Sequence, residues 1–316
     1  MNNALLKDTI KKYCSNIKRY EFHKNSVVFT DEYDKKYVAK PNNNNVLEIY
    51  NYLNSRGFGY LPRLEYCDDT GYIYDYIESV DTPSEQKISD LIKLDALLHN
   101  KTAYYKEMAI DEIKEMYDNL EERINNVFYY YDDLITMVES KVYMSPGEYL
   151  FARNVSTIFS CLNFCRSELD SWYDIVSTNS KKRVVFLHNN LDVDHLIRND
   201  DNYLISWNNA TRDLPIYDFI RLYKLNYDKY DFKDLYDEYI KKFPLLPEEK
   251  KLLFIILFIP EKIKFSDNEF QSCVDVRRLC EYLFKTDGLF MKYQTKNSEK
   301  QEHQVNEQQE HLKSAT

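Results

Sequence analysis

The stretch Val184–Tyr223 limits the possible folds of this 316-residue chain more than any other part of the sequence. A polar loop that carries His188 and His195 lies there between two short apolar runs, and a Pro-x-Tyr-Asp sequence that ends in Asp218 follows. Short apolar runs bounded by polar residues predict buried strands, and Asp218 stands where a helix is expected to begin. The stretch therefore predicts a strand, a loop, a strand and a helix, in that order.

Segments upstream of this stretch also show regular sequence patterns. Residues 18–40 alternate β-prone runs with turns, which predicts three strands of a small sheet, the last of them ending in Lys40. Residues 46–53 space their apolar side chains as a helix does, and this predicted helix carries Glu48. Further along, Leu97–Thr102 has the sequence Leu-Leu-His-Asn-Lys-Thr.

Taken together, these segments resemble the aminoglycoside phosphotransferase and choline kinase-like branch of the protein kinase fold. The family pattern is H-G-D-x-x-x-x-N, a strand, I-D-W-E-x-A and D-P-x-Y-D-L, and His188, Trp207 and Asp218 occupy matching positions. The run that ends in Lys40 resembles the third-strand V-A-x-K of the family, and Leu97–Thr102 resembles its L-x-x-L-H-x-x-T helix.

The resemblance covers residues 16–290 and implies an α+β protein with the two-lobed protein kinase-like fold. It implies a small antiparallel-sheet N-lobe with one helix over residues 1–82, and a mostly helical C-lobe with the loop over residues 83–294. The tail at 295–316 is strongly polar. We expect that tail to be disordered, because it has too few apolar side chains to bury.

The positions that carry the chemistry in the family hold other residue types here. Phosphoryl transfer needs an Asp that orients or deprotonates the acceptor hydroxyl, and an Asn and a second Asp that hold magnesium. Aligned on His188, these positions are Asn190, His195 and Ser206. A carboxamide accepts no proton at neutral pH, and imidazole and a neutral hydroxyl are poor ligands for a hard cation. The resemblance thus implies a degenerate site in which no catalytic residue is intact and no metal is bound.

Other family positions are retained. The resemblance implies that Lys40 is a remnant of the nucleotide-binding site, with Glu48 as its ion-pair partner. It also implies that His188 and Asp218 brace the loop and do not react. No cofactor is expected; weak ATP binding through Lys40 is compatible with the sequence, but the magnesium site is expected to be lost.

Two acidic residues within the loop leave an alternative open. Asp192 and Asp194, with His195 as a third ligand, could form a relocated metal site. In the matched motif these positions flank the loop and mostly face away from the cleft. For Trp207 and Asp213 we expect packing and capping roles.

Within the superfamily, the chain is most similar to the CotS/YutH group of kinase-like spore coat proteins from spore-forming Firmicutes. Some members of that group also have a histidine at the His195 position and lack the acidic residues. The resemblance implies a pseudokinase that acts as a structural or interaction component in sporulation, with other proteins as partners. Two alternatives stay open: an atypical ATP-dependent phosphotransferase for a small hydroxylated or amino-sugar substrate, and a nucleotide-sensing pseudokinase.

Net charge and composition indicate which cellular compartment and which kinds of partner to expect. The net charge of −10 argues against a nucleic-acid-binding protein, which would be basic. The N-terminal sequence has no apolar core of signal-peptide length, and the apolar run Leu252–Ile259 is too short for a membrane span. The six cysteines form no C-x-x-C pair, which favours reduced thiols. We therefore expect a cytoplasmic protein without a membrane partner, which could later be deposited in the spore coat.

Two long amphipathic helices are predicted in the larger lobe. Apolar side chains recur at steps of three and four over residues 110–134 and 151–176. Ser145-Pro146-Gly147-Glu148 between them offers an N-cap serine, a first-turn proline and a capping-box glutamate. An antiparallel hairpin within the chain follows, with a coiled-coil dimer as the alternative. Four more helices are predicted near 216–228, 231–243, 247–259 and 267–286.

Overall fold

The computed structural model describes the backbone at residues 2–23, 25–42, 44–179 and 181–314. Side chains are described from residue 6 to residue 292, apart from 24, 43 and 180. The chain forms two compact units that are discontinuous in sequence. The first comprises residues 1–106, 183–222 and 238–244, and the second comprises 107–182, 223–237 and 245–316. The predicted lobe boundary at residue 82 stays a prediction.

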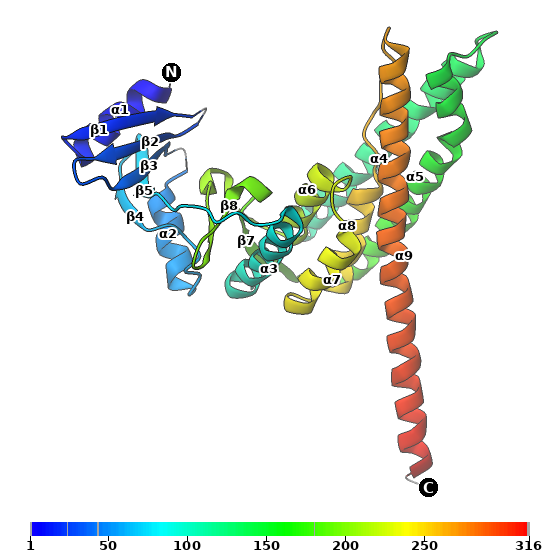
Figure 1. Ribbon diagram of the computed structural model, residues 1–316. Helices are drawn as coiled ribbons and strands as arrows, with labels where there is room; N and C mark the ends of the chain where they lie inside the picture. The colour runs from blue at the N-terminus through cyan, green and yellow to red at the C-terminus, as the bar shows by residue number, and fades with distance from the viewer. Residues whose placement is uncertain (1, 24, 43, 180, 315–316) are drawn as a thin grey trace. The chain divides into compact units, whose positions relative to one another are not determined.

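The first unit contains a five-stranded antiparallel sheet with the strand order β1-β2-β3-β5-β4 (Figure 1). Its strands are β1 Ile17–Phe22, β2 Val27–Asp31, β3 Lys36–Pro41, β4 Leu64–Cys67 and β5 Gly71–Asp75. Helix α1 Asn2–Tyr13 precedes the sheet, and α2 Val46–Ser55 lies between β3 and β4 in sequence. The three strands and the helix predicted over residues 18–53 are therefore confirmed.

Burial alternates along β2, which shows which face of this sheet packs against the core. Val27 and Phe29 are fully buried, whereas Val28 and Thr30 are only partly buried. Leu6 and Ile10 of α1 pack into the same core. The sequence analysis did not predict α1, although the spacing of Leu6, Ile10 and Tyr13 is the signal that would have found it.

In the sequence, the loop region of the first unit comes after helix α3, Ser84–Thr102. One small sheet has the order β10-β7-β6, and a second pairs β8 with β9. The elements are β6 Tyr104–Glu107, β7 Lys181–Leu187, η1 Val193–His195, β8 Leu196–Arg198, β9 Asn202–Leu204, η2 Trp207–Asn209 and β10 Thr211–Asp213. Helix α6 Ile216–Asn226 then begins in the first unit, as the Pro-x-Tyr-Asp sequence predicted.

The second unit is helical. Its long elements are α4 Ile110–Glu139, α5 Pro146–Thr178, α8 Pro247–Phe258 and α9 Glu269–Ser314, and α7 Phe232–Lys242 begins in it. The four helices predicted after the loop correspond to α6, α7, α8 and α9. The second half of helix α8 is apolar on all sides, and its residues Leu252 to Phe258 are all buried, as expected for a helix in the core.

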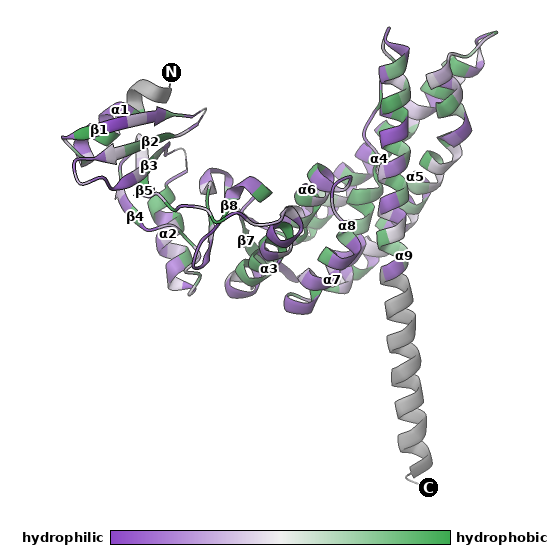
Figure 2. Cartoon of the chain, in the orientation of Figure 1, coloured by the Kyte–Doolittle hydropathy of each residue, from purple (hydrophilic) through white to green (hydrophobic). Residues whose placement is uncertain are grey.

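Helices α4 and α5 form the predicted antiparallel hairpin. Tyr117 near the start of α4 donates to Asp170 near the end of α5, whereas Phe128 packs against Phe159, with the rings tilted, towards the opposite ends. Ser145 and Glu148 form the predicted capping box at the start of α5. Figure 2 shows polar and apolar residues along both helices. Their apolar stripes are used inside the chain, which favours the hairpin over the coiled-coil dimer.

The polar tail predicted to be disordered, 295–316, lies outside the residues whose side chains the structure describes. Within the described residues, none of the helices combines the length and the apolar character that a membrane crossing requires.

Candidate functional site

Lys40 and Ser206, which are 166 positions apart, meet in the first unit. Lys40 is on β3, and its Nζ donates a hydrogen bond to Ser206 Oγ at 2.7 Å. Ser206 follows β9 and has a left-handed backbone, with φ 72° and ψ 48°. Burial lowers the pKa of Lys40 from 10.5 to about 8, because an ammonium is less favourable away from water. The structure thus places together two residues that the motif comparison had singled out separately.

The predicted ion pair between Lys40 and Glu48 is wrong. Val46, Ile49, Tyr50 and Leu53 form the buried face of α2, and Glu48 is exposed on another face of this helix. Among the described residues, Glu48 forms no salt bridge, and the serine hydroxyl is the hydrogen-bond acceptor of Lys40. Position on the predicted helix alone did not reveal which face would be buried.

Asp218 fixes the backbone of the His188 loop. It is buried at the start of α6, and its Oδ2 accepts from the His188 N–H at 2.7 Å while its Oδ1 accepts from the Asn189 N–H at 2.7 Å. This is the bracing arrangement that the resemblance implied. Asn189, which stands where the family pattern has glycine, adopts φ 53°. Asparagine is among the few residues that tolerate this region, so the loop keeps its shape without glycine.

His188 is a buried, neutral side chain. Its Nε2 lies 2.8 Å from the Ile205 carbonyl oxygen, and its ring meets the Trp207 ring edge-to-face at 4.6 Å. Burial lowers the pKa of His188 to about 4, against the attraction of Asp218. Trp207 is itself buried and donates from Nε1 to the Leu204 carbonyl, which agrees with its predicted packing role.

Asn190 and His195 hold the loop together through hydrogen bonds. His195 Nδ1 lies 2.7 Å from the Asn190 carbonyl oxygen, and Arg221 donates to Asn190 Oδ1 at 3.3 Å. The backbone of His195 also bonds with Asp192 and Ile205. The side chains at the family's base position and first metal position therefore make contacts within the protein.

The acidic residues of the loop do not converge on His195. Asp192 Oδ1 accepts from the Asp194 N–H at 3.0 Å and caps the 3₁₀ turn η1, while the Asp194 side chain is exposed. Asp213 likewise accepts from the next residue's N–H, which agrees with its predicted capping role. In the described part of the chain, these loop residues do not form a metal-ligand cluster.

A different group of ionisable side chains does converge, and the sequence analysis missed it. Asp95 and His99 are one turn apart on α3, and their side chains meet Asp218 in the interior of the first unit. His99 Nε2 lies 3.3 Å from Asp95 Oδ1 and 3.4 Å from Asp218 Oδ2. The available signal was an Asp and a His at i and i+4 among apolar residues of one helix.

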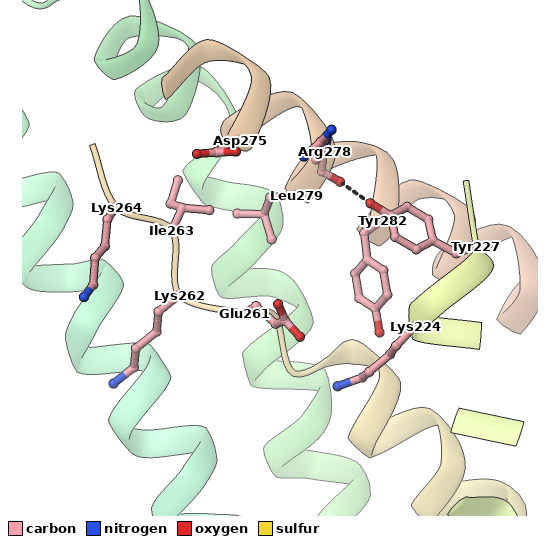
Figure 3. A pocket seen from close by; sticks show the side chains of 10 residues that line it. All are labelled: Lys224, Tyr227, Glu261, Lys262, Ile263, Lys264, Asp275, Arg278, Leu279 and Tyr282. Carbon is pink, nitrogen blue, oxygen red and sulfur yellow. Dashed lines mark hydrogen bonds between the residues drawn. The ribbon is translucent and has the colours of Figure 1, made fainter. Parts of the chain in front are cut away.

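The second unit has a cavity of about 460 Å³ (Figure 3). Tyr130 and Tyr131 of α4 donate to the carbonyls of Ile263 and Glu261, which fixes the loop along one wall. The lining residues are Lys224, Tyr227, Glu261, Lys262, Ile263, Lys264, Asp275, Arg278, Leu279 and Tyr282.

The charges that line this cavity are mixed. Burial, together with the charge of Arg123, lowers the pKa of Lys224, and Glu261 acts in the opposite direction. Figure 3 shows Lys262 and Lys264 extending away from α9, and the Lys262 ammonium lies 5.0 Å from the centre of the Tyr130 ring. Four basic and two acidic side chains line the cavity, so both signs of charge are present with an excess of positive charge.

Solved structures share the architecture of the chain. Neither a protein-family model nor a curated protein matches the sequence. An aminoglycoside phosphotransferase from Alicyclobacillus acidocaldarius subsp. acidocaldarius DSM 446 matches with a TM-score of 0.66 and 12% identity, covering 92% of this chain and 95% of that one. The AMP-bound spectinomycin phosphotransferase APH(9)-Ia matches with a TM-score of 0.53 and 11% identity, covering 90% and 97%.

The chain has the protein kinase-like fold. The α+β class and the two-lobed fold predicted from the sequence are thereby confirmed. Identities this low establish the fold alone. What the kinase-like fold does in this chain depends on the residues at Lys40, Ser206 and the His188 loop.

Replacing Lys40 by methionine tests whether the buried ammonium group of Lys40 destabilises the folded state. At pH 7 both the folded and the unfolded chain carry the proton, so burial of the charge destabilises the fold, and Lys40→Met is expected to raise the free energy of unfolding by about 1–3 kcal/mol. Between pH 8 and 10.5 the unfolded chain still binds this proton but the folded chain releases it. The free energy of unfolding of the wild type therefore rises relative to that of the variant as the pH increases through this window. Urea unfolding at several pH values would measure this change.

Lys36→Met is the matched control for that experiment, because Lys36 is an exposed lysine on the same strand. Its effect on the free energy of unfolding should be small, because the Lys36 side chain is exposed. An equal pH dependence in both variants would contradict the assignment to Lys40.

Proposed function

We propose that this kinase-fold protein has no phosphotransferase activity and acts as a structural or interaction component during spore formation. The observation that carries the first part is the 2.7 Å hydrogen bond from Lys40 to Ser206. In a kinase-like phosphotransferase, the lysine on this strand meets the nucleotide phosphates and an acidic residue at the second position binds magnesium. Here the lysine bonds instead to a neutral hydroxyl at that position.

The loop supports the same proposal. A general base must have an accessible atom that accepts a proton, and a magnesium site needs hard oxygen ligands. Asn190 offers a carboxamide that already accepts from Arg221, and His195 faces a backbone carbonyl. The interactions that remain, centred on Asp218, hold the loop in place and supply no reacting group.

The role in sporulation rests on the resemblance to the CotS/YutH group. Its partners would be other proteins of the coat or of its assembly, and the chain would be made in the cytoplasm before deposition. The test is made in the organism that produces the chain. Loss of the gene should impair the coat, whereas the double variant Asn190→Ala with Ser206→Ala should restore it, and failure of that variant to restore it while folded would contradict a purely structural role.

Nucleotide sensing without turnover is the second candidate, and the position of Lys40 favours it. The Lys40 side chain is only partly exposed, and with a pKa of about 8 its amine is largely protonated at neutral pH. A buried cation of this kind attracts anions such as phosphates.

Nucleotide binding through Lys40 should not depend on magnesium. The two metal positions hold His195 and Ser206, so adding magnesium should change the dissociation constant for ATP by less than about tenfold, equivalent to about 1.4 kcal/mol. Calorimetric titration with ATP, with and without magnesium, measures this. Tightening beyond tenfold would point to metal ligands other than these two positions, and Lys40→Met should weaken any binding that is observed.

A further inference from the structure

Asp95, His99 and Asp218 form a buried cluster, and Asp218 is the member that also holds the backbone of the His188 loop. All three side chains are buried, with exposures of 0%, 0% and 1%. One ligand atom from each lies within 4.8 Å of the others. Asp95 and His99 share one face of α3, and Asp218 comes from α6, so two separate helices supply the group.

The hydrogen bonding of this cluster is incomplete. Asp218 accepts two backbone N–H groups, but neither oxygen of the Asp95 carboxylate has a hydrogen-bond partner among the described residues. His99 Nε2 is also without a hydrogen-bond partner of good geometry in that part of the chain. Buried polar groups are nearly always satisfied in native proteins, and a buried carboxylate without a partner is strongly unfavourable. A ligand that is absent from the protein atoms would resolve this.

The two distances from His99 Nε2 to the carboxylate oxygens fit a metal ion. Bonds from zinc to nitrogen and oxygen are about 2.0–2.2 Å long, so two ligand atoms of a tetrahedral site lie about 3.3–3.6 Å apart. His99 Nε2 is 3.3 Å from Asp95 Oδ1 and 3.4 Å from Asp218 Oδ2. His99 Nδ1 lies 2.7 Å from the Tyr239 hydroxyl, which fixes the ring and turns Nε2 towards the carboxylates. Such an outer hydrogen bond is the usual companion of a metal-bound histidine.

We propose that Asp95, His99 and Asp218 form a structural site for one divalent transition-metal ion, with zinc the best match. Two carboxylates and one imidazole suit zinc, whereas magnesium requires octahedral oxygen ligands. The charge of the ion would neutralise two buried carboxylates.

The site has a structural consequence for the loop. Because Asp218 holds the backbone of His188 and Asn189, a metal on Asp218 would connect α3 to that loop. The enclosed position means that the ion would be bound as the chain folds, so that its binding free energy adds to the stability of the folded state.

Metal analysis of the full-length protein is the first test. After purification without a metal-affinity step and desalting, inductively coupled plasma mass spectrometry should find about one zinc ion per chain, and refolding with cobalt should give the intense visible bands of a tetrahedral site. Refolding in a chelator should lower the thermal midpoint relative to refolding with zinc. Protein that is folded, contains no transition metal after refolding with zinc and shows the same midpoint in both buffers would overturn the proposal.

Substitutions distinguish a metal site from a cluster that binds no metal and holds only protons. Asp95→Asn should lose the zinc and abolish the zinc-dependent shift in midpoint, while Asp194→Asn, which removes an exposed carboxylate from the same unit, should retain both. If the cluster instead stays metal-free, Asp95→Asn removes only an unfavourable buried group and should unfold at the same temperature as wild type or higher, which would contradict the site. Should Asp95→Asn fail to fold, the wild-type metal content still decides. The catalytic proposal is unaffected by either outcome, because it rests on Asn190, His195 and Ser206.

Discussion

Incubated with ATP, magnesium and an aminoglycoside, choline or a hydroxy amino acid, the purified chain is expected to release no ADP above the protein-free rate. Positioned acid–base catalysis contributes about 10²–10⁴-fold, and the charge of the metal ions contributes several kcal/mol more. Asn190, His195 and Ser206 supply neither, and Lys40 is bonded to Ser206. A coupled enzymatic assay that follows ADP release over hours measures whether any turnover occurs.

The control for this assay is an active kinase-like phosphotransferase in the same buffer with its own substrate. Turnover by this chain that Lys40→Ala abolishes would contradict the proposal and favour the alternative, an atypical phosphotransferase. Because a contaminating ATPase would be unaffected by that substitution, the Lys40→Ala variant distinguishes the two sources of ADP.

Local patterns predicted most of the fold because they have strong physical causes. The capping box at Ser145 and Glu148 and the long three-and-four spacing on either side of it specified α4 and α5, and both helices formed. The first three strands were equally clear, since turns separate β-prone runs there. Helix α1 and strand β6 were missed. Strand β6, Tyr104–Glu107, is exposed at all four residues, so it has no alternation for a pattern to detect.

The candidate site was predictable to the extent that it depends on motif order. The backbone contacts of Asp218 and the burial of His188 followed the resemblance. The Lys40–Ser206 bond did not, since it depends on which side chain fills the space left by a missing carboxylate. The ion pair with Glu48 failed because the rotation of α2 about its axis is set by packing of its apolar face. Asp95 went unnoticed, because its importance comes from its distance to Asp218, a residue from another helix.

Replacing Asp218 by alanine is expected to lower the free energy of unfolding by about 2–4 kcal/mol. The substitution leaves the N–H groups of His188 and Asn189 without acceptors in a buried place, and each unsatisfied donor costs about 1–3 kcal/mol. Urea unfolding in the presence of a chelator measures this effect apart from any bound metal. Asp218→Asn keeps one acceptor oxygen, so its loss should be intermediate.

Asn190→Ala is the matched control, because it removes a loop side chain whose contact is the 3.3 Å hydrogen bond from the exposed Arg221. Its expected change is under about 0.5 kcal/mol. This contrast separates the two roles that the kinase-like fold combines in one loop: the backbone is held by Asp218, whereas under the proposed function position 190 takes no part in chemistry. A neutral Asp218→Ala, together with a folded Asn190→Ala that had lost its biological role, would reverse this assignment and make the side chain of Asn190 functional.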